Sequence, residues 1–174
     1  ACLRPSLYWL PNSLPGTGLG KTEYRTDFAV RSASPLLAAL GVTMWPKLSG
    51  FVAARVANAR QYLSDLPSPL VVAPVAPGDG AVPSYLRLPL LVQSGHLRDR
   101  LLRRLNAAGV GATRSYPGSI ADIAELQPLF AAAPDAAVGR WVAERILTLP
   151  THPYVTSRDI ERTLAVLHRP WGAA

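Results

Sequence analysis

Apolar residues recur at helical spacing through the first third of the chain, after an opening segment that has no such period. Residues 1–32 are rich in Pro, Gly, Thr and Ser, and we expect an extended arm there. Ser34 followed by Pro35 is a helix-start signal, because the serine oxygen can accept from the free amides of the first turn and proline loses no hydrogen bond at the first helical position. Apolar positions then return every three to four residues, with a break at Pro46. The pattern predicts one kinked helix or two helices between Ser34 and Leu66.

The remainder of the chain alternates short β-like runs with amphipathic stretches. We expect strands where apolar and β-branched residues run together, at 70–75, 85–92, 110–115 and 146–149. We expect helices at 94–108, from Asp135 and from Thr156 or Ser157, with a loosely helical connection at 122–130. Pro89 within the second run predicts an edge position or a bulge. The irregular alternation indicates an α+β fold: a small antiparallel or mixed sheet of about three to four strands with helices packed on one face.

The composition is that of a folded protein with one domain beyond the arm. The chain has 174 residues, of which 49% are apolar and 17% charged, which excludes intrinsic disorder. We therefore divide it into the arm, 1–32, and a single small domain, 33–174. Cys2 is the only cysteine, which excludes an internal disulfide and a cysteine-based zinc cluster. Unbroken apolar runs fall far short of the ~20 residues that cross a bilayer, and prolines interrupt the N-terminal segment, so we expect no membrane span and a cytoplasmic protein.

The net charge of +7 favours anionic partners. Phosphates, nucleotides, nucleic acid and acidic protein surfaces would all be attracted, and charge alone does not choose among them. The arginines are spread along the chain, and no nucleic-acid reader motif accompanies them, so we do not expect a nucleic-acid partner.

Motifs for nucleotide, metal or nucleophile chemistry are incomplete. The glycine-rich stretch 16–22 lacks a Walker A motif, because Pro15 stands where the first glycine is needed. The histidines, His96, His152 and His168, are too far apart in sequence to suggest a metal site.

A constrained turn at Tyr116-Pro117-Gly118 follows the third predicted strand. Turn chemistry alone explains these residue types. Aromatic residues in loops after strands are also common ligand contacts, so Tyr116 is a candidate binding residue as well.

Several short motifs occur in a characteristic order. The predicted long helix contains a serine, an Ala-Ala-Leu-Gly step and an arginine before a tyrosine, at Ser34, Ala38-Ala39-Leu40-Gly41, Arg55, Ala59 and Tyr62-Leu63. A strand, a helix and a glycine step follow, at Tyr85 to Val92, Arg100, Leu101, Leu105 and Gly109-Val110. The last motifs are the Tyr116-Pro117 turn and the closing strand Ile146 to His152. Together they resemble the C-terminal region of the DegT/DnrJ/StrS sugar aminotransferases, a branch of the fold-type I pyridoxal-phosphate enzymes. Leu7 to Pro11 and Leu19 to Thr22 resemble the arm of polysaccharide-linked members.

The resemblance implies a function and also a departure from it. Family members transfer an amino group from glutamate to a nucleotide-linked keto-sugar, with pyridoxal phosphate held as a Schiff base to a lysine of a Ser-x-Lys turn in the large domain. The only lysines here are Lys21 and Lys47, and neither has that context. We therefore expect no coenzyme bound covalently to this chain, and a chain that is not catalytic by itself.

Three residues are implied as contacts with the substrate or the cofactor phosphate: Tyr116, Arg31 and Ser32. The family arginine before the helix falls on Ser32, with Arg31 displaced by one position, and Ile120 stands where the family has a histidine after the Tyr-Pro turn.

The partners that the resemblance implies are a missing large domain or a homodimer mate, with a nucleotide-sugar as a possible ligand. The chain would then be the small domain of such an enzyme, as a truncated form, a proteolytic remnant or a degenerate stand-alone gene product. The alternative is a non-catalytic binding or interaction module for a nucleotide-sugar or an acidic protein.

Overall fold

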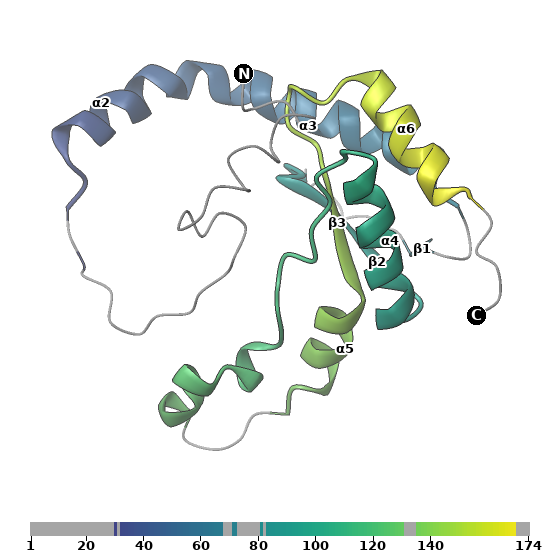
Figure 1. Cartoon of the computed structure of the whole chain (residues 1–174). Coiled ribbons are helices and arrows are strands. Elements are labelled where there is room, and N and C mark those ends of the chain that lie inside the picture. Colours follow the sequence, from purple (N-terminus) through teal and green to yellow (C-terminus); the bar gives the residue numbers. More distant parts are fainter. Residues whose placement is uncertain are drawn as a thin grey trace.

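The computed structural model describes residues 30, 32–67, 71–72, 81, 83–130 and 135–169. Nearly all of the predicted arm lies outside these residues, so the arm stays a prediction, as does the domain boundary at residue 33. Within the described residues the fold is α+β, as the sequence indicated (Figure 1).

The sheet is antiparallel, with the strand order β1-β2-β3. Its strands are β1 (Val71–Val72), β2 (Arg87–Val92) and β3 (Ile146–Pro150). The register of β2 against β3 is continuous from the Arg87–Pro150 pair to the Leu91–Ile146 pair. Pro89 lies in regular pairing with β3, so the bulge offered for it is wrong. Although β2 is the middle strand, its other side has no strand partner at the level of Pro89 among the described residues, as an edge position requires. The described residues of β1 pair only with Leu91 and Val92, so they do not reach the level of Pro89.

The strand expected at 110–115 does not form. Only Thr113 pairs with β3, as an isolated bridge to Thr148. The reason is local backbone geometry: Gly109, Gly111 and Ser115 have φ values of 74°, 68° and 59°, which are left-handed and incompatible with an extended strand.

The long N-terminal helix is confirmed, together with its break. Helix α2 (Pro35–Met44) begins at Ser34, whose hydroxyl accepts from the Leu37 amide at 3.3 Å. A 3-10 turn, η2 (Trp45–Lys47), contains Pro46, and helix α3 (Leu48–Leu63) continues from it.

The other helices lie where apolar periodicity placed them. They are α4 (Gly95–Ala107), α5 (Ala137–Arg145) and α6 (Ser157–Leu167). The loosely helical connection consists of two 3-10 segments, η3 (Ile120–Asp122) and η4 (Ala124–Leu129). Helix α6 begins with a capping box, in which the Thr156 hydroxyl accepts from the Asp159 amide and the Asp159 carboxylate accepts from the Thr156 amide.

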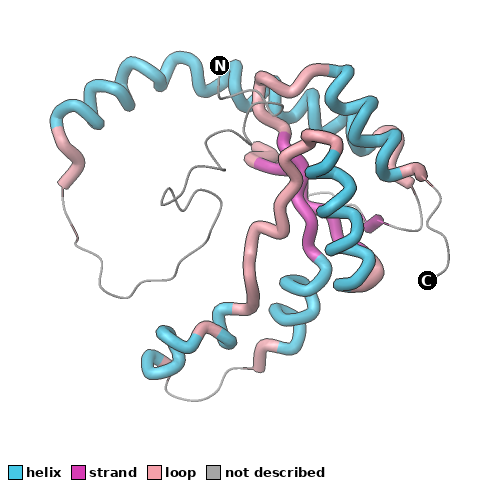
Figure 2. Tube along the Cα trace, viewed as in Figure 1, coloured by secondary structure: helices cyan, strands magenta, loops and turns pink. Residues whose placement is uncertain are grey.

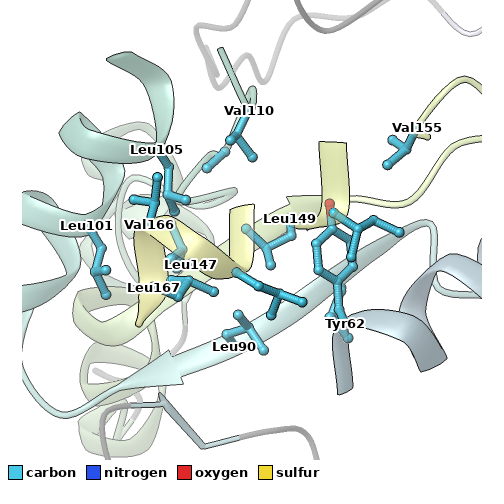
Figure 3. Close-up of a cluster of buried hydrophobic side chains, with 14 of the residues drawn as sticks. Tyr62, Leu90, Leu101, Leu105, Val110, Leu147, Leu149, Val155, Val166 and Leu167 are labelled. Atoms are coloured by element: carbon cyan, nitrogen blue, oxygen red, sulfur yellow. The ribbon is translucent and has the colours of Figure 1, made fainter. Parts of the chain in front are cut away.

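The hydrophobic core lies on one face of the sheet. Alternate residues of the strands, Leu88 and Leu90 on β2 and Leu147 and Leu149 on β3, are fully buried there. Side chains of α3, α4 and α6 meet them, among them Tyr62, Leu101, Leu105, Val166 and Leu167 (Figure 3). Helices α4 and α6 lie side by side over this face, and α3 packs against α6 (Figure 1). The predicted packing of helices on one face of the sheet is therefore confirmed.

Helix α2 takes no part in this core. It contains no buried residue, and it extends away from the strands and the other helices (Figure 2). The helical stretch Pro35–Leu63, which comprises α2, η2 and α3, is long and apolar enough to cross a membrane by length and composition alone, with a mean hydropathy of 1.4 over an 18-residue window. The search of the sequence for unbroken apolar runs missed this segment, because Ala, Gly, Thr and Ser separate its large apolar residues. At its C-terminal end, Ala59 and Tyr62 are buried in the core, so α3 is in part a core helix.

Candidate functional site

The turn at residues 109–118 is the most constrained segment that the structure describes near the sheet. Its three left-handed residues, Gly109, Gly111 and Ser115, alternate with residues that anchor it. Val110 and Ala112 are buried in the core. The turn is thus held from the inside by apolar contacts, and its polar residues remain on the outside.

A hydroxyl cluster centred on Thr148 fixes the outer side of the turn. Thr148 lies in β3 on the face opposite the core and is buried. Its hydroxyl lies 2.9 Å from the Thr113 hydroxyl and 3.0 Å from the Ser115 hydroxyl. Thr113 and Thr148 also exchange two backbone hydrogen bonds, of 3.1 and 2.7 Å. The cluster therefore attaches the turn to the sheet just before Tyr116.

Arg87 joins three parts of the chain at the same place. Its Nε donates to the Thr148 hydroxyl at 2.8 Å, and one terminal nitrogen donates to the carbonyls of Gly111 at 2.7 Å and Thr148 at 3.1 Å. A guanidinium group offers several donors in a rigid plane, so one side chain can hold β2, β3 and the turn in fixed positions. We call Arg87, Thr113, Ser115 and Thr148 the Thr148 cluster.

The Thr148 cluster keeps a strained residue in place and leaves Tyr116 accessible. A left-handed conformation disfavours Ser115 by about 1 kcal/mol or more, because its Cβ crowds the backbone. The Tyr116 amide donates to the Arg114 carbonyl at 2.7 Å, which closes a tight turn around Ser115. The Tyr116 side chain is 58% exposed. A strained, tethered turn that ends in an exposed aromatic residue is a common arrangement at binding sites.

The three predicted site residues are not gathered in one place. Arg31 lies outside the described residues. Ser32 is exposed and lies just before the N-terminal end of α2, which extends away from the strands (Figure 2). Tyr116 follows the turn beside β3 instead. Within the described residues, only Tyr116 belongs to the Thr148 cluster region.

A second polar group links α3 to the segment after β3. Asn58 donates to the carbonyls of Thr151 and His152, at 3.0 and 3.2 Å. Burial lowers the pKa of His152, and the positive charges of Arg55 and Arg87 lower it further. His152 is therefore held neutral at physiological pH, in a region where arginine charges dominate.

Sequence reasoning missed all four members of the Thr148 cluster. A weak signal was present, since Arg87 and Thr148 are polar residues inside otherwise apolar strands. A polar side chain at such a position requires a hydrogen-bonding partner, but the sequence does not say which one.

The described residues do not fit a lysine-anchored coenzyme. Lys47 is exposed at the end of η2, between Pro46 and Leu48, far along the chain from the Thr148 cluster. A covalent coenzyme site needs a lysine amine beside groups that hold the phosphate and the ring. Lys47 has no such surroundings, and Lys21 lies outside the described residues.

Comparison with known proteins gives one family and a set of similar folds. The DegT/DnrJ/EryC1/StrS aminotransferase family matches residues 33–168. A solved structure of the aminotransferase TlmJ from Streptoalloteichus hindustanus is 26% identical, with a TM-score of 0.65, over 82% of this chain and 38% of that one. A DegT DnrJ EryC1 StrS aminotransferase from Brucella abortus is 24% identical, with a TM-score of 0.67, over 85% and 39%. DesV from S. venezuelae is 21% identical, with a TM-score of 0.69, over 86% and 41%. The chain thus spans about two fifths of each solved structure. The comparison with curated proteins gives no match.

Proposed function

Because this chain belongs to the DegT/DnrJ/EryC1/StrS aminotransferase family, we propose that it is the C-terminal small domain of a nucleotide-sugar aminotransferase and is not catalytic by itself. The observation that carries the proposal is the extent of the similarity. The family match covers most of this chain, whereas the chain spans only about two fifths of the solved aminotransferases.

The lysine content supports the second half of the proposal. The family depends on pyridoxal phosphate, which requires an amine anchor, and this chain offers only Lys21 and Lys47. The coenzyme would supply electron withdrawal from the reacting carbon when a complete enzyme holds it. The residues of this chain would bind and orient the substrate beside it.

Tyr116 is the residue that we assign to that task, with Arg31 and Ser32 as further contacts with the substrate or the cofactor phosphate. The Thr148 cluster fixes the backbone on one side of Tyr116, and the side chain itself supports nothing in the core. Its phenol can stack on a planar group or donate to a phosphate oxygen. Tyr116→Ala should therefore leave the stability of this chain within ~0.5 kcal/mol of wild type, which makes it a clean probe of binding.

The amine anchor is tested directly with the coenzyme. The purified chain is mixed with an equimolar amount of pyridoxal phosphate, reduced with borohydride and examined by intact mass and peptide mapping. We expect no stoichiometric adduct at either lysine. A stoichiometric adduct on Lys21 or Lys47, abolished by the matching Lys→Arg substitution, would refute the proposal, as would transamination by the chain alone.

One observation favours a second candidate, a protein-interaction module. Helix α2 exposes apolar residues over its whole length. Co-purification with a protein unrelated to the aminotransferase fold would favour that candidate. A rise in melting temperature with a nucleotide-sugar, in the absence of any other protein, would favour a stand-alone binding module for that ligand.

A further inference from the structure

One polar junction joins three separate parts of the chain: α3, the residue before β2, and the segment between β3 and α6 (Figure 1). Asn58 of α3 donates to the carbonyls of Thr151 and His152. Arg55, one helical turn earlier, donates to the Leu86 carbonyl at 2.5 Å, and the Thr151 hydroxyl donates to the same carbonyl at 3.3 Å. We call Arg55, Asn58, Leu86, Thr151 and His152 the His152 junction.

The imidazole ring of His152 fits this junction only in its neutral form. The ring is half-buried, and the phenol ring of Tyr154 lies beside it, with the ring centroids 6.0 Å apart. Nδ1 is fully buried and has no hydrogen-bond partner within the described residues. Both nitrogens of an imidazolium are donors, so protonation puts an N–H at Nδ1 where no acceptor lies. A buried donor without an acceptor is costly, and the protonated ring therefore disfavours the closed junction.

The charges around His152 also oppose its protonation. Burial lowers the pKa of His152 most, and Arg55 of α3 and Arg87 of β2 lower it further. Asp159 of α6 is the carboxylate that acts on the ring, and its effect is the smallest of these. Asp159 is also engaged elsewhere, because it caps α6 and pairs with Arg162. A proton on His152 would thus add a third positive charge beside two arginines.

A second histidine holds the other end of α3 through a contact of the opposite character. Nε2 of His168, which follows α6, lies 2.9 Å from the carbonyl oxygen of Asp65 and 3.4 Å from its carboxylate, just beyond the end of α3. A proton on His168 adds an attraction to that carboxylate, although a small one, since both side chains are exposed. Acid therefore weakens the attachment of α3 at the His152 junction and not at His168.

We propose that the His152 junction is a pH-sensitive contact, which opens when His152 is protonated while the sheet and the other helices stay folded. The ring moves toward water together with the backbone that Asn58 holds, so residues 151–155 separate from α3. Ala59 and Tyr62 keep the C-terminal end of α3 in the core. Helix α2 continues α3 through η2, so the opening also changes how firmly the direction of α2 is fixed.

Amide hydrogen exchange of the full chain at about pH 7.5 and about pH 5.5 tests the proposal, with each rate divided by the intrinsic rate of that amide at the same pH. The amide of Val155, which donates to the His152 carbonyl at 2.9 Å, and the amides of residues 55–59 report on the junction. An open junction leaves His152 with its ordinary pKa of 6.5, so the corrected rates should rise about threefold to tenfold at the lower pH. The corrected rates of the α4 amides should change less than about twofold.

Two histidine variants separate the junction from other effects of acid. His152→Gln keeps a polar side chain that does not titrate, so the rise at the lower pH should disappear. His168→Gln is the matched control, because it removes the histidine at the other end of α3, and it should keep the rise. His168 is exposed, so this control should fold as the wild type does.

Equal corrected rates in the wild type at both pH values would overturn the proposal, because the ring would then leave without moving the backbone. A rise that persists in His152→Gln, or an equal rise in α4, would overturn it as well. Proton NMR of the wild type needs no variant: the His152 ring should titrate with a pKa below 6.5, and a pKa at or above that value would also refute the proposal. These measurements involve neither coenzyme nor substrate, so their outcome is independent of the proposed function.

Discussion

Substitution of Thr148 by valine is the sharpest test of the Thr148 cluster. Valine has nearly the same shape as threonine, so the variant removes hydrogen bonds and leaves no cavity. The hydroxyl that is lost accepts from Arg87 Nε at 2.8 Å and bonds the hydroxyls of Thr113 and Ser115. The two neighbouring hydroxyls can turn toward water, so each loss should amount to about 0.5–1 kcal/mol.

The guanidinium group of Arg87 contributes the larger part. Arg87 is half-buried, and the substitution removes the neutral hydroxyl that accepts from its charged Nε. Losing a hydrogen bond to a charged group costs about 1.5–3 kcal/mol of stability. The sum is a destabilisation of about 2.5–5 kcal/mol, reduced if water enters beside the valine.

Equilibrium unfolding in urea, followed by far-UV circular dichroism, gives the free energy of unfolding. Amide exchange of residues 111–116 shows whether the turn itself has loosened. Thr43→Val is the control, because the Thr43 hydroxyl donates only to the Ala39 carbonyl on an exposed helix, and it should change stability by less than ~0.5 kcal/mol. Equal stabilities of Thr148→Val and wild type, with unchanged exchange in the turn, would show that the cluster does not hold the turn.

Three further changes test the local geometry. Gly109→Ala should destabilise the chain by about 1–2 kcal/mol, because φ is 74° there, whereas Gly118→Ala, also in open space, should be nearly neutral in the same urea titration. His152→Gln should remove part of the acid sensitivity. The pKa of His152 in the folded chain lies below its ordinary value of 6.5, so the unfolded chain takes up the proton first as the pH falls. The stability of the wild type should therefore fall as the pH drops below about 6.5. Parallel profiles of stability against pH for the variant and the wild type would contradict this. Asp159→Ala should destabilise by about 1–2 kcal/mol at pH 7 by removing the capping box of α6. Burial raises the pKa of Asp159, but the hydrogen bonds from Thr156 and the charge of Arg162 outweigh it, so the pKa lies below 3.8 and the difference between the proteins should shrink as the pH falls through that region.

Local sequence signals described the helices well. Ser34 and Thr156 cap the helices that they were expected to begin, and Pro46 lies in the break that it predicted. These signals involve side chains and amides within about four residues of each other, so they can be recognised without knowledge of the fold.

Strand signals were less reliable where the backbone leaves the extended region. The run at 110–115 has the composition of a strand, but Gly111 and Ser115 are left-handed, and only Thr113 pairs with the sheet. Pro89 was expected at an edge or a bulge because proline has no N–H to donate; no bulge forms, and within the described residues only β3 pairs with the strand at that level. Pairing depends on which segment comes to lie alongside, and the strand's own residues do not encode that partner.

In the candidate site, too, local sequence signals identified one residue, whereas contacts between distant segments could not be predicted. The exposed Tyr116 could be found from its place in a Tyr-Pro turn, but the residues that hold the turn could not. Arg87 and Thr148 are 61 positions apart, and Thr113 and Thr148 are 35 apart. No spacing rule connects them, because they meet only through the register of β2 against β3.

By itself, the sequence determined the α+β class, the positions of the helices and the similarity to an aminotransferase small domain. Its hydrophobic period and capping residues act over one or two turns of helix, which is why they can be interpreted directly. Only the tertiary structure decided that Thr148 is the centre of a polar cluster and that α2 is left uncovered while α3 enters the core. The polar cluster and the exposure of α2 both depend on which distant segments pack together in the core. Whether a residue is buried is therefore decided by residues far away in the chain.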